Sequence, residues 1–192
     1  AAIKMVKEVS LLRPHVKTNK IAEVCRMMMD AGISKFKCAT IAEAEMLGMI
    51  EAKDVLLAYQ PVGPKVGRLL KLKEKYSSTL YSCVVDDFAA AKRISEVFAA
   101  AGLTMDVYID LDTGMKRTGI AVSKAFALFQ QLQTLPGIKV KGLHGYDGHI
   151  VEPNPLLRQQ ESDAAFKEVE GLALAIEEIT KQPCIIIAGG SP

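Results

Sequence analysis

Short runs of apolar, often β-branched residues alternate with longer segments of helical period along the whole chain. This pattern predicts strands at residues 11–17, 35–39, 55–60, 80–85, 106–112, 140–146 and 184–188. Helices are predicted around residues 19–31, 40–50, 63–75, 87–101, 123–134 and 156–180. Thr40 and Glu43 have the spacing of a capping box, and Asp86 and Ser123 are expected N-caps. The repeated strand–helix order is typical of a parallel α/β domain.

Two architectures accept this order, an open doubly wound sheet and a (β/α)₈ barrel. The fingerprint G-x-G-x-x-G, which favours the first, does not follow the first predicted strand. Polar residues at the ends of most predicted strands favour the barrel, because barrel active sites are assembled there. These residues are Lys17, Thr40, Gln60, Asp112, Tyr146 and Ser191. Since seven strands fall one short of a barrel, we expect residues 1–192 to form an incomplete (β/α)₈ barrel that lacks its last strand and helix.

Length, charge and cysteine content limit the cellular compartment and the classes of binding partner that we expect. A length of 192 residues supports one domain core, and residues 1–9 resemble the last turns of a helix, so we expect the chain to start inside a longer protein. The formal charge of +2 argues against nucleic acid and membrane surfaces as partners. The four cysteines form no C-x-x-C pair, and no leader or long apolar run is present. These features predict a cytoplasmic protein with reduced, buried thiols.

Residues 12–20 carry the first candidate for chemistry. Pro14 fixes its own φ and biases the preceding residue toward extended backbone, so residues 11–17 are predicted to be extended. In an extended run, Arg13, His15 and Lys17 share one face. Burying this face without an anion is costly, which makes Lys17 a candidate Schiff-base lysine beside an anionic cofactor. An exposed edge strand with a solvated basic face is the alternative.

Residues 110–119 (DLDTGMKRTG) follow a predicted strand. Gly114 and Gly119 allow a tight turn that returns Arg117 over the strand end. The guanidinium is always charged and donates in a fixed fork, so it suits an anionic oxygen of a ring or a carboxylate. A surface loop with an exposed arginine is the alternative.

Residues 142–149 (GLHGYDGH) are rich in glycine at another predicted strand end. Alternation places His144 and Tyr146 on one face, and glycine within a strand marks close approach by a ligand or a backbone. A β-bulge beside a core tyrosine is the alternative. His149 has no carboxylate or thiol at ligand spacing, so it is weak evidence for zinc.

Residues 185–192 (IIIAGGSP) read as a buried strand that opens into a turn of small residues before a helix. Such a turn exposes backbone N–H groups and the positive end of a helix dipole, which together bind phosphate. Barrel phosphate sites favour the loops after strands 7 and 8, and this is the seventh predicted strand. Gly189, Gly190 and Ser191 are therefore candidate phosphate ligands, with a plain turn before a helix as the alternative.

These motifs, in this order, resemble those of the D-threonine aldolase and D-serine dehydratase family, whose barrel is similar to the N-terminal domain of alanine racemase. Residues 13–20 resemble its arginine-proline-histidine-x-lysine-threonine-histidine-lysine signature, although Asn19 stands where the family has histidine. The resemblance implies that Lys17 carries pyridoxal 5′-phosphate (PLP). It also implies that Arg117 contacts the cofactor near its phenolic oxygen and that Tyr146 lies beside it. The turn of Gly189, Gly190 and Ser191 resembles the family's phosphate loop.

The resemblance covers essentially the whole chain and implies a PLP-dependent lyase that acts on D-β-hydroxy amino acids, by retro-aldol cleavage or by dehydration. An amino-acid racemase and a non-catalytic PLP carrier are the alternatives. In the family, a C-terminal β-domain, absent from these residues, supplies metal ligands and closes the site across a dimer. We therefore expect divalent metal ligands, if any, to lie outside this chain, and the full-length protein to be a homodimer.

Overall fold

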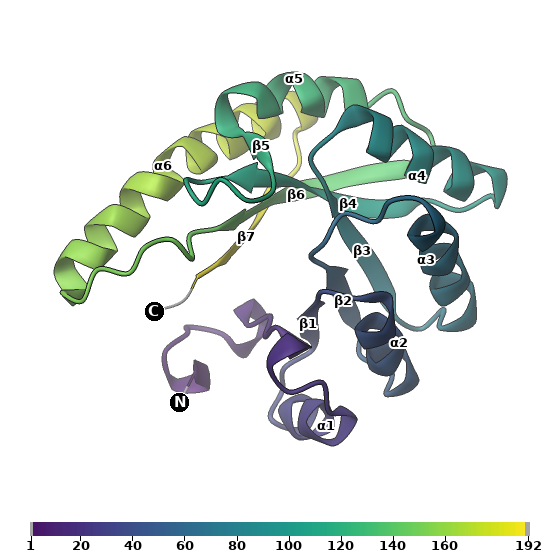
Figure 1. Cartoon of the computed structure of the whole chain (residues 1–192), viewed down its shortest axis with the longest axis horizontal. Coiled ribbons are helices and arrows are strands. Elements are labelled where there is room, and N and C mark those ends of the chain that lie inside the picture. Colours follow the sequence, from purple (N-terminus) through teal and green to yellow (C-terminus); the bar gives the residue numbers. More distant parts are fainter. Residues whose placement is uncertain (1, 191–192) are drawn as a thin grey trace. The chain divides into compact units, whose positions relative to one another are not determined.

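The computed structural model describes residues 2–190. They fall into two compact units that divide between Val84 and Val85 and whose elements are labelled in Figure 1. Both units consist of parallel strands connected by helices, as the hydrophobic pattern predicts. The predicted helices are all present, with ends shifted by at most three residues.

The first unit contains the parallel strands β1 (Lys35–Cys38) and β2 (Asp54–Leu57) and, except for its last residue, β3 (Leu80–Val85), in that order. Its helices are α1 (Ala22–Asp30), α2 (Ile41–Met49) and α3 (Pro64–Lys75). Phe36, Leu47 and Leu69 are fully buried in its core. The N-cap half of the predicted capping box is confirmed, because the Thr40 hydroxyl accepts a hydrogen bond from the Glu43 N–H at 3.1 Å. The Glu43 carboxylate accepts from the Ala39 N–H at 2.8 Å rather than from that of Thr40.

The strand predicted at residues 11–17 is wrong. The chain here forms short 3₁₀ turns, Val9–Leu11 and Val16–Thr18, like the one at Ala2–Lys4. The residues between Leu11 and Val16 contact β1 through an isolated bridge from His15 to Lys37. The Lys37 N–H also donates a hydrogen bond to the Pro14 carbonyl at 2.9 Å. The extended backbone that Pro14 favours is therefore too short to form a ladder, and Lys17 lies in a turn rather than on a strand.

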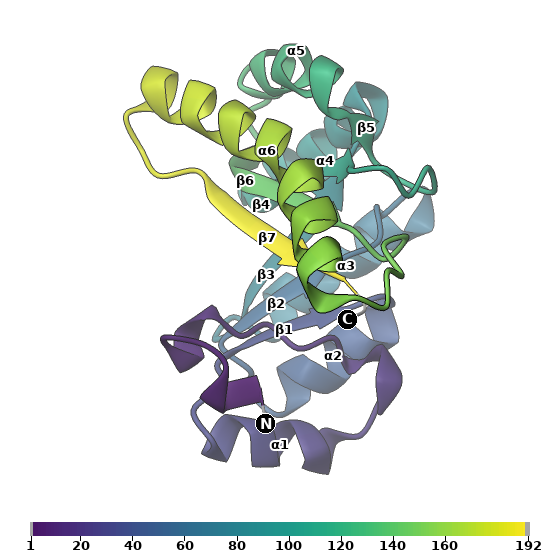
Figure 2. The same cartoon turned by 90° about the vertical axis from the view of Figure 1, so that its left-hand side faces the viewer.

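The second unit contains β4 (Met105–Asp112), β5 (Ile120–Ala121), β6 (Ile138–Tyr146) and β7 (Ile185–Gly189). β4 pairs with β5 and β6, and β6 pairs with β7, all in parallel. The two-residue β5 was not predicted, so the described residues contain seven strands but not the seven expected. Helices α4 (Phe88–Ala100), α5 (Val122–Leu132) and α6 (Pro155–Thr180) pack on this sheet, and α6 runs alongside β7 (Figure 2).

The faces of β6 are distinguished by its glycines. A Cβ on Gly145 would lie 3.0 Å from the ring of Phe166 in α6, so this position faces the helices. By alternation, His144 and Tyr146 lie on the opposite face. A Cβ on Gly142 would overlap the Ile185 carbonyl oxygen of β7, and the register with β4 shifts beside it. This glycine therefore serves strand packing, with a bulge four residues before the tyrosine.

Two of the expected N-caps are wrong. Asp87, not Asp86, caps α4 through its carboxylate, which accepts from the Ala90 N–H at 2.9 Å. Helix α5 begins at Val122 after Ala121, so Ser123 lies inside its first turn. Asp86 is thereby left for another contact described below.

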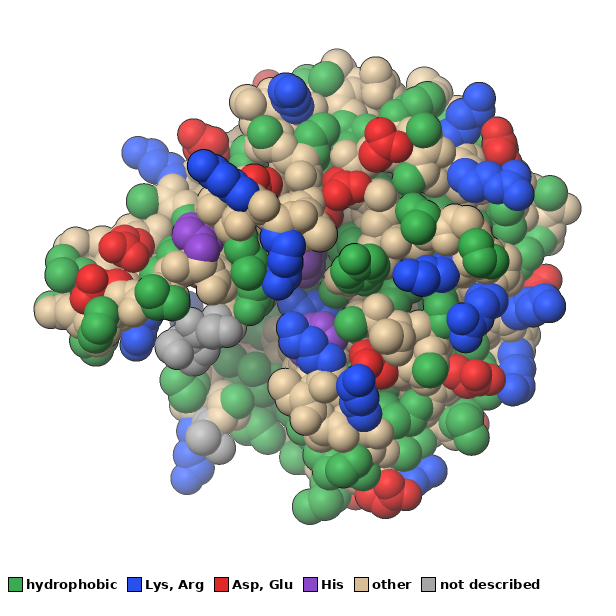
Figure 3. All heavy atoms as spheres, in the orientation of Figure 1, with side chains coloured by type: hydrophobic (Ala, Val, Ile, Leu, Met, Phe, Trp, Pro, Cys, Tyr) green, Lys and Arg blue, Asp and Glu red, His purple; other side chains and the backbone are tan. Residues whose placement is uncertain are grey.

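The helices of residues 2–190 include no segment long and apolar enough to cross a membrane. On the face shown in Figure 3, acidic and basic side chains are both scattered over the surface, with hydrophobic side chains between them.

Candidate functional site

The loop after β4 is fixed by its own first residue. The Asp112 carboxylate accepts hydrogen bonds from the N–H groups of Gly114 and Lys116, each at 2.9 Å. These two bonds, that of Lys116 more strongly, hold the pKa of Asp112 below its usual value, because they stabilise the charged form. The loop therefore begins as a tight, charge-assisted turn.

The end of the same loop is fixed by Gly119 and Asp86. The Gly119 N–H donates to the Asp86 carboxylate at 3.0 Å. Gly119 has a φ of +95°, and a Cβ there would lie 2.6 Å from the backbone nitrogen of Asp112. Only glycine fits this position without strain, and Gly114 has a φ of +124°, so conformation explains both glycines predicted to allow the tight turn.

Between these two anchors, Arg117 lies over the ring of Tyr146. The guanidinium carbon is 5.3 Å from the ring centroid, a cation–π distance. Arg117 is exposed, whereas Tyr146 is half-buried at the end of β6. The Thr113 hydroxyl donates to the Tyr146 carbonyl at 3.0 Å and so joins the loop to β6. The structure thus brings together two of the residues predicted from separate motifs.

A buried pair that the sequence analysis missed lies on the same face. Nδ1 of His144 is 2.6 Å from Oδ1 of Asp110, its direct neighbour in the β4–β6 register. Their side chains are only 7% and 11% exposed, so an ionised Asp110 needs this hydrogen bond. Nε2, on the other edge of the ring, points away from Asp110. The alternation of His144 with Tyr146 was the available signal, but the register with Asp110 was not predictable from one strand.

The predicted phosphate turn begins at Gly189, beside Tyr146, and its two described residues, Gly189 and Gly190, are here called the glycine turn. Gly189 is paired opposite Tyr146 in the β6–β7 register and ends β7. Gly190 follows, and a Cβ there would overlap a carboxylate oxygen of Asp147. Ser191, the third predicted phosphate ligand, lies outside the described residues. Arg117, Tyr146, Gly189 and Gly190 all belong to the second unit.

Lys17 belongs to the first unit. It lies in the turn Val16–Thr18, where its N–H donates to Nδ1 of His15 at 3.2 Å. Its side chain is exposed, whereas the adjacent Val16 is 1% exposed. Arg13 forms a bidentate ion pair with Asp54, both distances being 2.7 Å. Because Arg13 is neutralised by Asp54, it does not contribute the cationic face predicted with Lys17.

The cysteines are free thiols. Cys25, Cys38 and Cys83 are buried and Cys184 is partly buried, as predicted for three of the four. Burial raises the pKa of Cys184 to about 11 and that of Cys83 to about 12, which disfavours the thiolate needed for nucleophilic attack or metal binding. Within residues 2–190, no group of three or more His, Cys, Asp or Glu side chains is arranged to hold a metal ion.

Comparison with known proteins shows which family this chain belongs to. The family model described as alanine racemase, N-terminal domain, matches residues 2–191. The chain therefore belongs to the alanine racemase N-terminal domain family. This membership confirms the predicted fold class, a (β/α)-barrel of parallel strands and helices that is incomplete here.

Three individual proteins show which members of the family this chain is similar to. The chain is 28% identical over 187 residues to D-threo-3-hydroxyaspartate dehydratase of Delftia sp. strain HT23, covering 94% of this chain and 47% of that protein. It is 29% identical over 140 residues to D-threonine aldolase of Arthrobacter sp., covering 72% and 36%. The crystal structure of D-threonine aldolase from Filomicrobium marinum superposes with a TM-score of 0.83 at 26% identity, covering 92% and 48%. The chain thus spans half or less of the length of these relatives.

Proposed function

We propose that this chain forms the PLP-binding barrel of a lyase that acts on D-β-hydroxy amino acids. The observation that carries the proposal is the stacking of Arg117 on Tyr146 at adjacent strand ends, in a chain related to an aldolase and a dehydratase of such substrates. Barrel enzymes assemble their active sites at these strand ends.

The described residues of the second unit fit PLP. The cofactor has a flat ring, a phenolic oxygen and a phosphate group, and each has a suitable partner. The exposed guanidinium of Arg117 suits the phenolate, and the adjacent Tyr146 offers an aromatic side chain. Gly189 and Gly190 offer backbone N–H groups for the phosphate. When bound, PLP supplies an electron sink for negative charge at the substrate Cα.

Lys17 is the residue that we propose to carry the cofactor covalently. The Lys17 amino group would hold the cofactor and, when it is not bonded to the cofactor, would accept and return a proton. The turn Val16–Thr18 and the buried Val16 hold its backbone, while its side chain is exposed. Asn19, where the family has histidine, accepts from the Ile21 N–H at 3.1 Å and so ends the turn.

Two reactions are compatible with this site. An aldolase removes the proton of the β-hydroxyl group and breaks the Cα–Cβ bond, which gives glycine and an aldehyde. A dehydratase removes the α-proton and expels the β-hydroxyl group. We propose that divalent metal ligands, where the reaction needs them, come from residues outside this chain, that the working protein is a homodimer, and that D-amino acids rather than nucleic acid or membranes are its partners.

A racemase is the second candidate, because the matching family model is that of alanine racemase. Racemisation needs a proton donor on the face of the substrate opposite Lys17. The experiment that separates these functions is incubation of the PLP-loaded protein with D-threonine, D-serine and D-alanine, with and without Mn²⁺, followed by product analysis. Glycine plus acetaldehyde or an α-keto acid supports the lyase, L-alanine supports the racemase, and PLP binding without any product supports a non-catalytic carrier.

A further inference from the structure

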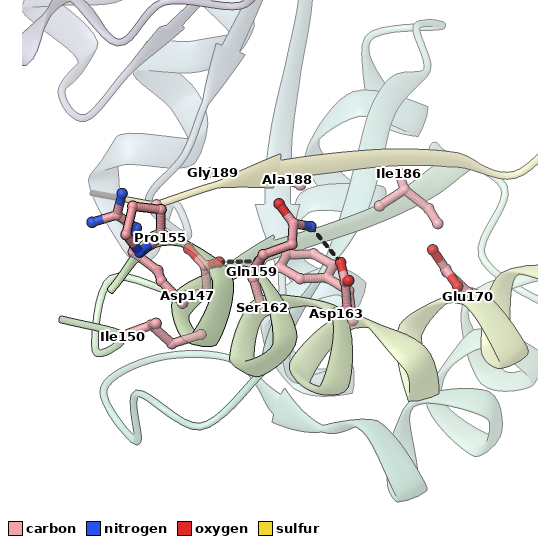
Figure 4. A pocket seen from close by; sticks show the side chains of 13 residues that line it. Asp147, Ile150, Pro155, Gln159, Ser162, Asp163, Glu170, Ile186, Ala188 and Gly189 are labelled. Carbon is pink, nitrogen blue, oxygen red and sulfur yellow. Dashed lines mark hydrogen bonds between the residues drawn. The ribbon is translucent and has the colours of Figure 1, made fainter. Parts of the chain in front are cut away.

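The glycine turn is bordered by a carboxylate that the proposed function does not use. Asp147 directly follows β6, and its N–H donates to the Gly189 carbonyl at 3.0 Å. Oδ2 of Asp147 accepts a hydrogen bond from the Ser162 hydroxyl of α6 at 2.8 Å, the contact drawn in Figure 4. Oδ1 lies against Gly190, where a Cβ would overlap it. Backbone and side chain therefore both hold this carboxylate at the turn.

Asp147 lines one end of a pocket of about 850 Å³ between α6 and β7. Asp163 and Glu170 lie further along the same helix and line the same pocket (Figure 4). Arg158 also lines it and donates to the Glu152 carbonyl at 3.4 Å. Asp163 accepts from the Gln159 amide at 2.7 Å, so it has the same charge as Asp147 but a different anchor.

A phosphate at the glycine turn would lie close to Asp147. Hydrogen bonds from the turn have donor–acceptor distances of about 2.9 Å, so the phosphate would be within about 8 Å of a carboxylate that touches Gly190. This separation does not exceed the Debye length of about 8 Å at physiological ionic strength. The repulsion between the carboxylate and the phosphate is therefore only partly screened.

We propose that Asp147 is a built-in competitor of the cofactor phosphate, a carboxylate held at the glycine turn by Ser162 that lowers the affinity of this turn for anions. This inference rests on the proposed phosphate site of Gly189 and Gly190. Its consequence is that cofactor affinity is set by a balance between backbone N–H groups that attract phosphate and a fixed charge that opposes it.

The test is a set of equilibrium titrations of the apoprotein with PLP and with pyridoxal, which lacks the phosphate, followed by absorbance. Asp147→Asn keeps the side-chain shape and still accepts from Ser162, but it removes the charge. We expect its Kd for PLP to be about three- to tenfold lower than that of wild type. The Kd for pyridoxal should be unchanged, because no phosphate is repelled.

Asp163→Asn is the matched control, since it removes the same charge from the same pocket at a position held by Gln159. It should change the Kd for PLP by less than about twofold. The inference is overturned by any of three results. These are PLP binding by Asp147→Asn that is no tighter than that of wild type, the same increase in PLP affinity in Asp163→Asn, or an equal increase in the affinity of Asp147→Asn for pyridoxal. If neither wild type nor Asp147→Asn binds PLP, both the inference and the proposed function fail. If both bind PLP with equal affinity, only the inference fails.

Discussion

At the scale of single residues, contacts within the protein already explain why certain residue types stand at their positions, before any ligand is considered. Gly190 is the clearest case, because a Cβ there would overlap Asp147. A glycine predicted for close approach of phosphate therefore has a second reason to be glycine. The two reasons make different predictions.

Gly190→Ala should separate them when it is made alone and together with Asp147→Ala. In the wild-type background, we expect a loss of stability of about 1–3 kcal/mol from overpacking, measured by urea unfolding of the apoprotein. Asp147→Ala vacates the overlapping atoms, so the same substitution should then cost less than about 0.5 kcal/mol. Loss of PLP affinity in both backgrounds would identify phosphate approach as the additional constraint, whereas an undiminished stability cost in the double variant contradicts the steric account.

The buried pair of His144 and Asp110 gives the second prediction at this scale. His144→Phe keeps a ring of similar size but removes the nitrogen that lies 2.6 Å from the carboxylate. We expect a loss of about 1–3 kcal/mol in the free energy of unfolding, because the buried Asp110 loses this hydrogen bond. His149→Phe, at an exposed position, is the control and should change stability by less than about 0.5 kcal/mol. Similar effects of the two substitutions would show that the pair is not important for stability.

At the scale of elements, the loop between β4 and β5 is the part of the site that the sequence describes best. Its glycines and its arginine predict a tight turn over a strand end, and the structure has that turn, fixed by Asp112 and Asp86. Asp86 was expected to cap α4 instead, since two adjacent aspartates make the position of an N-cap ambiguous. Such an ambiguity is resolved by tertiary contacts, which one sequence does not contain.

Gly119→Ala tests the importance of this loop. The φ of +95° and the 2.6 Å approach to the Asp112 nitrogen should force the loop to rearrange. We expect a loss of stability of about 1–3 kcal/mol and weaker PLP binding, because Arg117 is displaced from Tyr146. Gly171→Ala in α6, where a Cβ meets nothing within 4 Å, is the control and should stabilise the protein by about 0.5–1 kcal/mol. Unchanged PLP affinity in Gly119→Ala would show that the loop does not position the cofactor.

At the scale of the whole molecule, hydrophobic periodicity was sufficient to predict the alternation of parallel strands and helices. It failed at residues 11–17 because a few extended residues, bridged to β1 only at His15, look the same in sequence as a strand. It also missed β5, which has only two residues and depends on its pairing with β4. The pairing of Asp110 with His144 likewise depends on strand register, which periodicity does not fix.

Lys17 is the residue that we propose to carry PLP. The most direct measurement is borohydride reduction of the PLP-loaded protein, followed by proteolysis and mass spectrometry of the labelled peptide. We expect the pyridoxyl group on Lys17, and loss of the label in Lys17→Ala but not in Lys20→Ala. A pyridoxyl group on Lys20, Lys35 or Lys37 in the wild-type protein would contradict it.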